Sequence, residues 1–244
     1  LMSDLGGRRF LPGLSERPAD ELYGQALDAL LQMPTRLPSQ DLPAYDEQRL
    51  TAEMELMPTW FFERHLGFTP SCEQWDVIEL AFRKLLDSAG RQAQAFVHRD
   101  YHSRNLLISE SGQPGILDFQ DAVHGPITYD LVSLLRDCYV AWPDDRVEAW
   151  VEADRQRAET AGLATGSPAQ FLQAFDLMGL QRHIKVLGIF CRLYYRDGKS
   201  GYLGDLPLVW EYTRRIGRKY PETAPLIELI EHAIGTRDIT LPSA

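Results

Sequence analysis

The stretches HRDYHSRN at residues 98–105 and ILDFQD at residues 116–121 decide the fold of this chain. A dense group of turn residues, SGQPG at 111–115, separates two short apolar runs at 106–108 and 116–117. Small polar residues with Gly and Pro between apolar runs favour a β-hairpin. The sequence therefore predicts a hairpin with polar side chains at its open end.

This predicted hairpin brings three polar side chains together. A turn near residues 111–112 pairs residues whose numbers sum to about 223, which places Asn105 opposite Asp118. The Cβ atoms of directly opposed residues lie roughly 4.5–5.5 Å apart. Two oxygen donors at that spacing suit Mg²⁺, which takes one or two protein oxygens together with phosphates and water. Asp100, five residues before Asn105, is placed to accept a proton from a substrate hydroxyl.

A zinc site is the alternative for the same stretch. His98 and His102 stand four residues apart, which on a helix would place both on one side. The helix of zinc hydrolases carries Glu next to the first His, and Arg99 occupies that place here. The sequence therefore favours His98 as a packed loop anchor, and it leaves His102 facing the substrate, the γ-phosphate or the solvent.

Composition limits the class of protein. Hydrophobic residues make up 44% and charged residues 25% of the 244 residues, which is typical of a soluble globular protein. No run of 18 apolar residues is present, so no membrane span is expected, and the net charge of −10 argues against a nucleic-acid partner. The widely spaced Cys72, Cys138 and Cys191 indicate isolated thiols in a reducing compartment, so we expect a cytoplasmic protein.

Apolar periodicity predicts helices over most of the chain. They are expected at about residues 19–32, 45–57, 71–89, 145–161, 169–195, 206–220 and 224–234, with a further helix opening at Tyr129 and a strand at 94–97. Pro34 is expected to end the first helix, and Gly125-Pro126 to form a turn. The predicted fold class is α+β, predominantly helical, with a small β-hairpin within residues 98–121.

The spacing His-x-Asp, then Asn five residues later, then Asp-Phe, is the second half of the kinase signature. The stretches FVHRDYHSRNLLI at 96–108 and GILDFQDAVHGPITYDLVSLLRD at 115–137 resemble the aminoglycoside phosphotransferase/choline kinase family. EMELMPTWFFERHLG at 53–67 and RLYYRDGKSGYLGDLP at 192–207 are similar to one bacterial branch, the kinases that phosphorylate the anomeric hydroxyl of N-acetylmuramate and N-acetylglucosamine in cell-wall sugar recycling. The resemblance implies the C-terminal lobe of a protein-kinase-like fold, with ATP as co-substrate, Mg²⁺ as cofactor and an amino sugar as acceptor.

The resemblance also implies roles for single residues. Asp100 would be the catalytic base, and Asn105 and Asp118 the metal ligands. Asp130 would brace the catalytic loop through backbone N–H groups, with His98 as structural support. A plain N-terminal helix cap is the other interpretation of Asp130. Asp121 is expected either near the substrate or in solvent.

The acceptor side is expected to combine polar groups with an aromatic face. Glu53, Trp60 and Phe61 fit a site of this kind, with His102 as a further substrate contact. Arg192, Asp197 and Lys199 would supply polar contacts, including a cation for a lactyl carboxylate. Burial in a helix interface is the alternative for Trp60, because aromatic side chains mostly contribute apolar burial. The same alternative applies to Glu53 and Arg192.

The domain expectation follows from the resemblance. Residues 1–14 would be a hinge remnant after an N-terminal ATP-binding lobe, and residues 15–244 the C-terminal catalytic and substrate lobe. Backbone groups of Met2, Ser3, Asp4 and Leu5 would meet the adenine. The Gly-rich loop and lysine of an ATP-binding lobe are absent from these 244 residues, so this chain alone is expected to turn over little.

Two alternatives stay open. An aminoglycoside, choline or another small alcohol would keep the chemistry and change the acceptor. An inactive truncated lobe that acts only as a binding module would have no catalytic activity. A protein kinase is disfavoured because only about a dozen residues separate Asp118 from Asp130 and no Ala-Pro-Glu sequence follows. The oligomeric state stays undetermined at this point.

Overall fold

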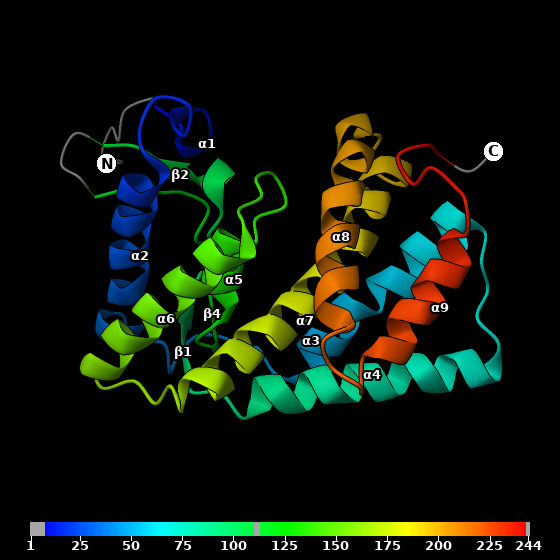
Figure 1. Cartoon of the computed structure of the whole chain (residues 1–244), viewed down its shortest axis with the longest axis horizontal. Helices are drawn as coiled ribbons and strands as arrows, with labels where there is room; N and C mark the ends of the chain where they lie inside the picture. The colour runs from blue at the N-terminus through cyan, green and yellow to red at the C-terminus, as the bar shows by residue number, and fades with distance from the viewer. Residues whose placement is uncertain (1–7, 110–112, 243–244) are drawn as a thin grey trace. The chain divides into compact units, whose positions relative to one another are not determined.

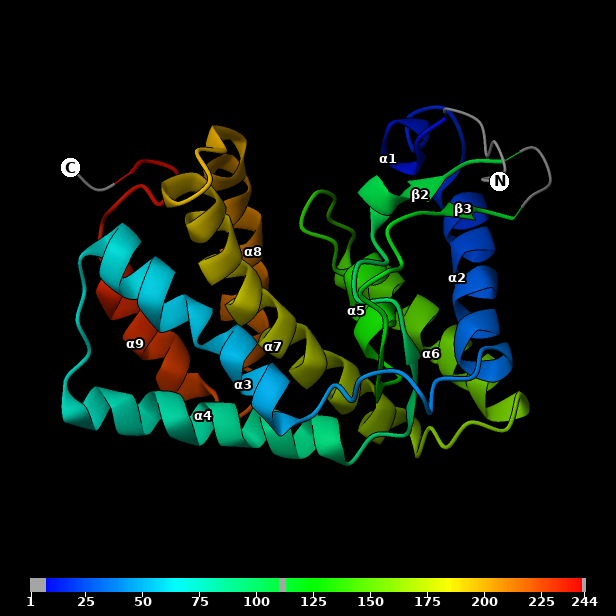
Figure 2. The same ribbon diagram turned by 180° about the vertical axis from the view of Figure 1, so that it is seen from behind.

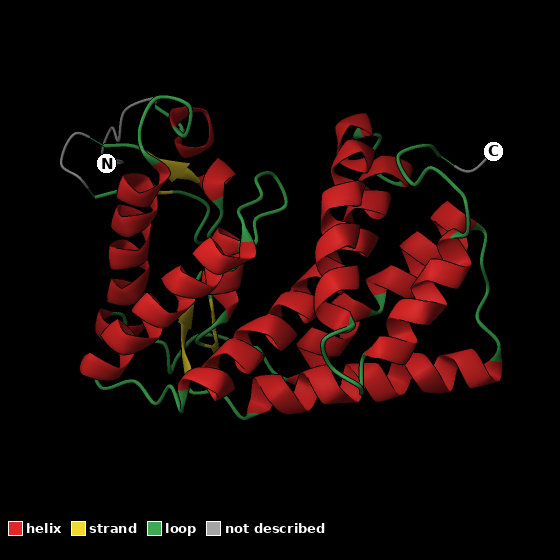
Figure 3. Cartoon of the chain, viewed as in Figure 1, coloured by secondary structure: helices red, strands yellow, loops and turns green. Residues whose placement is uncertain are grey.

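The computed structural model describes residues 8–109 and 113–242, and the chain divides into two compact units. The first unit comprises Leu1–Tyr45 and Gln92–Phe175, and the second comprises Asp46–Arg91 and Asp176–Ala244. Figure 3 shows that helices dominate, and the strands of the described residues all belong to the first unit. No helix within the described ranges combines the length and apolarity needed to cross a bilayer.

Two nested antiparallel ribbons organise the first unit. Strand β1 (Gln94–Val97) pairs with β4 (Val123–Pro126), and Val97 faces Val123. This pairing closes the base of the intervening segment, in which β2 (Leu106–Leu107) pairs with β3 (Gly115–Ile116) (Figure 2). The described residues between β1 and β4, 98–109 and 113–122, therefore form two arms of a folded loop that lie side by side where β2 pairs with β3.

Helices support this loop from within the first unit. Helix α2 (Ala19–Arg36) contacts β1, α5 (Tyr129–Leu135) and α6 (Asp144–Thr160) (Figure 1). The short α1 (Phe10–Gly13) contacts β2 and the turn before it. Every residue of α5 is buried, so this short helix is held by packing on all sides.

The second unit is helical throughout its described residues. It contains α3 (Glu47–Met54), a π-helical segment η1 (Met57–Leu66), α4 (Cys72–Gly90), most of α7 (Pro168–Tyr195), η3 (Ser200–Asp205), α8 (Leu206–Gly217) and α9 (Ala224–Ile234). Helix α4 contacts α3 and α9. It begins with a capping box in which Ser71 and Gln74 satisfy each other's backbone N–H groups.

Most predicted elements are confirmed, and three details are wrong. Helix α2 continues past Pro34 to Arg36, because a proline in the last turn removes only its own backbone donor. The helix expected from Tyr45 begins at Glu47, where the Asp46 carboxylate caps it by accepting from the Arg49 N–H.

The third correction concerns Gly125-Pro126, which was expected to form a turn. Both residues lie in β4 and pair with β1. Glycine is required at 125 because an added Cβ would lie 2.8 Å from the Cβ of Tyr45. The local turn signal was therefore overridden by a long-range strand pairing.

Candidate active site

The first arm of the folded loop is held by a buried carboxylate. Asp130, in the first turn of α5, accepts hydrogen bonds from the backbone N–H of His98 at 2.6 Å and of Arg99 at 2.9 Å. Arg99 has a φ of 76°, a left-handed conformation that non-glycine residues rarely adopt. The two hydrogen bonds therefore fix the backbone just before Asp100 in a strained geometry. This is the bracing contact that the resemblance implied for Asp130.

The His98 ring is buried and hydrogen-bonded to the loop that follows it. Its Nδ1 accepts the backbone N–H of Asp100 at 3.3 Å. Burial lowers the pKa of the imidazole, while the charges of Asp100 and Asp118 and the backbone carbonyl of Leu117 act in the opposite direction. The two carboxylates, 18 positions apart in sequence, therefore both lie near the same ring. The lowered pKa keeps His98 neutral at pH 7.

Asn105 ends a short 3₁₀ turn, η2 (Ser103–Asn105), and its side chain is oriented by the loop. The amide Nδ2 donates to the backbone carbonyl of Asp100 at 3.1 Å, and the backbone N–H of Asn105 donates to the His102 carbonyl at 2.9 Å. The amide bond orients the Asn105 side chain and leaves Oδ1 without a hydrogen-bond donor among the described residues.

The predicted strand register is wrong by one residue. Leu106 pairs with Ile116, and the Leu117 N–H donates to the Asn105 carbonyl at 3.0 Å, so Leu117 rather than Asp118 stands opposite Asn105. Asp118 has a φ of 69°, which takes the chain out of the ribbon at that residue. In a continuous strand Asp118 would face the opposite side from Leu117. The left-handed residue breaks that alternation. The hairpin turn itself, expected at 111–112, lies outside the described residues.

The donor set at the open end of the hairpin fits a hard divalent cation. Asp118 is exposed, and its Oδ1 accepts from the Gln120 amide at 2.7 Å, which leaves Oδ2 without a donor among the described residues. Together with Asn105 Oδ1 this makes two oxygen ligands of the type that Mg²⁺ prefers. Left-handed backbone at a non-glycine residue is uncommon and concentrates at functional sites. The residues present therefore fit a magnesium site shared with phosphates.

A second buried carboxylate, missed at the sequence level, supports the other end of the loop. Asp137 Oδ2 accepts the backbone N–H of Ser103 at 2.8 Å. Asp137 is 1% exposed and follows the apolar run of α5. A carboxylate is almost never fully buried unless it is paired. An Asp that closely follows the apolar run of a predicted helix was therefore the feature of the sequence that could have identified Asp137 as a buried, hydrogen-bonded carboxylate.

The remaining expected residues of the first unit are placed as follows. His102 packs edge-on against Tyr139, with 5.6 Å between ring centroids. Asp121 is exposed, and its backbone carbonyl accepts from the Arg99 guanidinium at 3.5 Å. The expected adenine contacts at Met2, Ser3, Asp4 and Leu5 lie outside the described residues.

The acceptor residues expected in the second unit lie along one seam between α7 and the α3–η1 segment. Lys185 Nζ meets Glu53 at 2.9 Å, and an added Cβ on Gly188 would lie 2.3 Å from the Leu56 carbonyl carbon. Further along, the Tyr195 hydroxyl hydrogen-bonds His65 at 3.0 Å. Both segments therefore run in the same direction. Trp60 lies in η1 and Arg192 in the last turn of α7.

Each of these acceptor residues retains a polar or aromatic surface. Glu53 and Lys185 have side chains 14% and 11% exposed, so the ion pair is largely withdrawn from water. Trp60 and Arg192 are half-buried, and Arg192 Nε has no hydrogen-bond partner in the described part of the chain. Glu53, Trp60 and Arg192 therefore lie on α3, η1 and α7, the elements that form this seam, and their role as sugar contacts stays a prediction.

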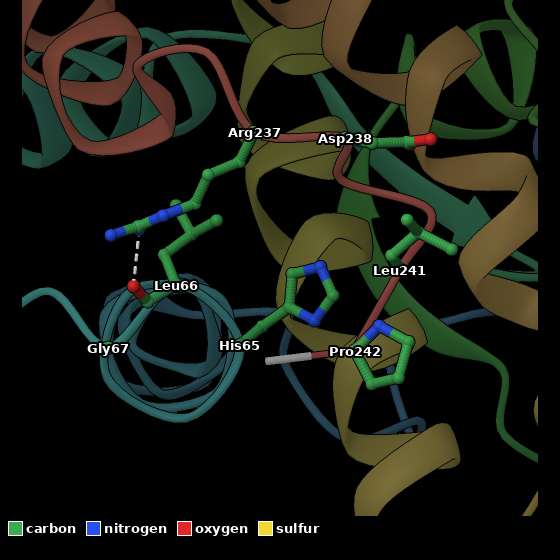
Figure 4. Close-up of a pocket in the computed structure, with 7 residues that line it drawn as sticks. All are labelled: His65, Leu66, Gly67, Arg237, Asp238, Leu241 and Pro242. Atoms are coloured by element: carbon green, nitrogen blue, oxygen red, sulfur yellow. Dashed lines mark hydrogen bonds between the residues drawn. The ribbon is translucent and has the colours of Figure 1, made fainter. Parts of the chain in front are cut away.

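A separate surface pocket in the second unit has different chemistry. It has a volume of about 500 Å³, and its seven lining residues are drawn in Figure 4: His65, Leu66, Gly67, Arg237, Asp238, Leu241 and Pro242. Arg237 donates to the Leu66 carbonyl, and His65 is bonded through both ring nitrogens, to Tyr195 and to the Ile239 carbonyl. Burial lowers the pKa of His65. The side chains of His65 and Arg237 in this pocket therefore make hydrogen bonds within the protein that stabilise the fold. None of the site residues predicted from the sequence lines the pocket.

The family follows from a sequence comparison that covers the catalytic loop and its supporting helices. Residues 1–168 match the profile of the family described as "Phosphotransferase enzyme family". This chain belongs to the phosphotransferase enzyme family. The predicted resemblance is thereby confirmed, and the geometry around Asp100, Asn105 and Asp118 belongs to a phosphotransferase.

Curated relatives of this phosphotransferase agree in name. A protein of Pseudomonas aeruginosa is 46% identical over 231 residues, which is 94% of this chain and 68% of that protein. A protein of Neisseria meningitidis is 37% identical over 244 residues, which is 98% of this chain and 73% of that protein. Both are named N-acetylmuramate/N-acetylglucosamine kinase.

Solved structures confirm the predicted fold class for this phosphotransferase. The choline/ethanolamine kinase family protein from Mesorhizobium loti superimposes with a TM-score of 0.58 at 14% identity, covering 94% of this chain and 73% of that one. ADP-bound aminoglycoside phosphotransferase APH(2'')-Ib gives a TM-score of 0.54 at 14% identity, covering 88% and 71%. The chain therefore shares the fold of small-molecule kinases.

Proposed function

We propose that this chain is the catalytic and acceptor-binding part of an ATP-dependent kinase that phosphorylates the anomeric hydroxyl of N-acetylmuramate and N-acetylglucosamine. The observation that carries the proposal is the backbone arrangement of the folded loop, in which Asn105 bonds the Asp100 carbonyl through Nδ2 and accepts the N–H of Leu117, the residue before Asp118. The relatives at 37–46% identity supply the acceptor by their common name. The cytoplasm, where ATP is available, is the proposed compartment.

Asp100 is proposed to be the base. Its carboxylate has no hydrogen-bond donor among the described residues, and its backbone N–H is held by His98. It therefore orients the C1 hydroxyl of the sugar and accepts its proton as the oxygen attacks the γ-phosphorus of ATP, while the bond from that phosphorus to the β–γ bridging oxygen breaks and ADP leaves. An anomeric hydroxyl is more acidic than an ordinary alcohol, which favours proton transfer to a carboxylate.

Asn105 and Asp118 are proposed to hold Mg²⁺ through Asn105 Oδ1 and the Asp118 carboxylate. When bound there, Mg²⁺ supplies neutralisation of the charge on the phosphates of ATP. Neutral His98 adds no competing positive charge, because its pKa is lowered by burial. The bond from Asn105 Nδ2 to the Asp100 carbonyl ties the proposed ligand to the proposed base, so the two move together.

The acceptor contacts are proposed along the seam of the second unit and at the catalytic loop. Glu53 would bind a sugar hydroxyl, Trp60 would cover the C–H face of the ring, and Arg192 would pair with the lactyl carboxylate of N-acetylmuramate. His102, which packs on Tyr139, is proposed as a further substrate contact on the loop that carries Asp100. The withdrawal of the Glu53–Lys185 pair from water supports a polar site rather than a solvated surface.

The domain assignment is also a proposal. Residues 1–14 would be the hinge next to an ATP-binding lobe, with Met2, Ser3, Asp4 and Leu5 at the adenine, and residues 15–244 the lobe described above. The Pseudomonas relatives are longer than the part that this chain matches, which is 68% of their length.

The test is an acceptor screen with the product of the complete open reading frame that encodes this chain. Purified protein, ATP and Mg²⁺ are incubated with N-acetylmuramate, N-acetylglucosamine, kanamycin or choline, and products are identified by ³¹P NMR. We expect a phosphate on C1 of both amino sugars. The matched control is 1-deoxy-N-acetylglucosamine, which differs only in lacking the C1 hydroxyl and should not react. Phosphorylation of kanamycin or choline in preference to the sugars, or a phosphate on C6, would overturn the proposal.

A further inference from the structure

Asp137 makes two hydrogen bonds that the proposed reaction does not itself require. The residue is 1% exposed, its Oδ2 accepts from the backbone N–H of Ser103 at 2.8 Å, and its Oδ1 accepts from the backbone N–H of Tyr139 at 3.1 Å. Both carboxylate oxygens are therefore committed to backbone groups. A buried carboxylate that accepts backbone N–H bonds holds those segments in place, since leaving the donors unpaired would be costly.

One of these bonds controls the turn that carries Asn105. Ser103 is the first residue of the 3₁₀ turn η2, and Asn105 is its last. The first N–H groups of a helical turn have no partner within the turn, and a carboxylate is a favourable acceptor for them. Asp137 therefore anchors the start of the turn, two residues before the Asn105 amide.

The other bond fixes an aromatic surface beside the same turn. Tyr139 packs against the edge of His102, and the Arg104 guanidinium lies 3.4 Å from the centre of its ring. His102 and Arg104 flank Ser103 in sequence. Asp137 thus holds the turn directly, through Ser103, and indirectly, through the ring on which both neighbouring side chains pack.

A single buried helix links this support to the opposite end of the loop. Asp130 lies in the first turn of α5 and holds His98 and Arg99, whereas Asp137 lies two residues beyond the end of α5 and holds Ser103. Helix α5 ends at Leu135, so Asp130 lies within the helix and Asp137 in the segment directly after it. The two carboxylates therefore hold both ends of residues 98–105 from one helix and its C-terminal extension.

We propose that Asp137 is a positioning residue that places the Asn105 side chain for divalent-cation binding. This inference rests on the proposed function, in which Asn105 is a metal ligand. Asp137 touches neither the substrate nor the metal, and its effect passes through the Ser103 N–H and the η2 turn. A change at Asp137 should therefore alter the affinity for the cation and leave the binding of the acceptor sugar unchanged.

The test measures cation binding without any acceptor sugar. Mn²⁺ replaces Mg²⁺ because it is paramagnetic, and its affinity for the product of the complete open reading frame, loaded with a non-hydrolysable ATP analogue, is titrated by electron paramagnetic resonance. We expect Asp137→Asn to weaken Mn²⁺ affinity about tenfold, since the asparagine keeps the shape but turns an NH₂ group toward one of the two backbone donors. Asp41→Asn, an exposed loop carboxylate, is the control and should bind as wild type.

A second variant removes the donor instead of the acceptor. Ser103→Pro deletes the N–H that Asp137 binds, and proline is tolerated at the first position of a helical turn when the preceding residue is extended, as His102 is with φ −132° and ψ 169°. The same loss of Mn²⁺ affinity is expected. Ser103→Ala keeps the N–H and removes a hydroxyl that has no partner among the described residues, so it should retain the affinity.

Hydrogen exchange separates positioning from simple folding. In Asp137→Asn the amides of 103–105 should exchange faster while the amides of α6 keep wild-type rates. Unchanged Mn²⁺ affinity in both Asp137→Asn and Ser103→Pro, or faster exchange throughout the first unit, would overturn the inference alone. Absence of Mn²⁺ binding by the wild-type protein would overturn the proposed function together with it.

Discussion

Asp130 and Arg99 are joined by a 2.9 Å hydrogen bond that holds a left-handed residue directly before the proposed base. The backbone N–H of Arg99 is the donor. Arg99 has a φ of 76°, a conformation that glycine adopts without strain but a residue with a side chain does not. A non-glycine residue in this region costs about 1–3 kcal/mol and persists only where the surroundings enforce it. The buried carboxylate of Asp130 provides that enforcement together with its bond to His98.

Asp130→Asn should therefore damage both stability and catalysis. Asparagine can accept only one of the two backbone bonds with its oxygen, so the other buried N–H loses its partner at a cost of about 1–3 kcal/mol. We expect a comparable loss in the free energy of unfolding, measured with urea, and a kcat decreased more than tenfold. A variant with full stability and wild-type kcat would show that Asp130 is only a helix cap.

Asp100→Asn should lower kcat by about 10²- to 10⁴-fold, because proton transfer to a positioned base typically contributes that much. The Asp100 carboxylate makes no hydrogen bond within the described residues, so the free energy of unfolding should stay within about 0.5 kcal/mol of wild type. Steady-state kinetics with N-acetylglucosamine and urea unfolding check both values. Asp41→Asn serves as the control, and a kcat for Asp100→Asn within a few-fold of wild type would contradict the assignment.

Arg192→Gln should discriminate between the two sugars. N-acetylmuramate carries a lactyl carboxylate that N-acetylglucosamine lacks, and a hydrogen bond to a charged group contributes about 1.5–3 kcal/mol. We expect KM to rise tenfold or more for N-acetylmuramate and less than about twofold for N-acetylglucosamine. Arg196→Gln, an exposed arginine paired with Asp197, is the matched control. Equal effects on both sugars would exclude Arg192 as the carboxylate contact.

Asp154 should make the stability of the first unit depend on pH. It lines a small internal cavity of about 20 Å³ together with Asp130 and Phe171, room for about one water molecule. Burial raises the pKa of Asp154 from 3.8 to about 7, with a smaller opposing effect from Arg157. The folded state therefore favours the protonated form, so stability is highest below pH 4 for this group and is lost progressively as the pH rises to about 7.

Asp154→Asn removes this dependence. The gain in the free energy of unfolding over wild type should grow from pH 4 to pH 7 by up to about 4 kcal/mol, at about 1.4 kcal/mol per unit of pKa shift, and then level off. Urea unfolding of both proteins at intervals of one pH unit gives the difference curve. Parallel curves for the two proteins would show that Asp154 titrates normally.

Gly188→Ala should destabilise the second unit, because the new Cβ would lie 2.3 Å from the Leu56 carbonyl carbon and 2.6 Å from the Met57 nitrogen. Backbone atoms cannot move aside as a side chain does, and overpacking of this kind costs typically about 1–3 kcal/mol. Gly24→Ala in α2 meets nothing within 4 Å and should instead stabilise by about 0.4–1 kcal/mol. Thermal unfolding of both variants checks the opposite signs.

Local patterns in the sequence were sufficient for the helices and for the identity of the proposed site. Helix α4 shows apolar periodicity along its own residues and has the capping residue Ser71 directly before it. The predicted range of 71–89 therefore agrees closely with the observed Cys72–Gly90. The residue types at 98, 100, 105 and 118 predict the proposed site because they stand at short spacing. The register of the hairpin did not follow, because a shift of one residue depends on the exact geometry of the turn. The left-handed conformation of Asp118 was not predicted from its neighbours either.

The sequence by itself determined that this chain is a helical phosphotransferase with its proposed base and metal ligands on one loop, because those features depend on residues close together along the chain. Only the tertiary structure decided how that loop is held. Asp130 in α5 and Asp137 just after this helix hold the loop from 32 and 34 residues further along the chain, and β4 closes its base by pairing with β1. Those contacts depend on which distant segments pack together. A buried carboxylate that accepts a hydrogen bond from a distant backbone N–H stabilises the fold, but it produces no periodic pattern of residues from which the contact could be predicted.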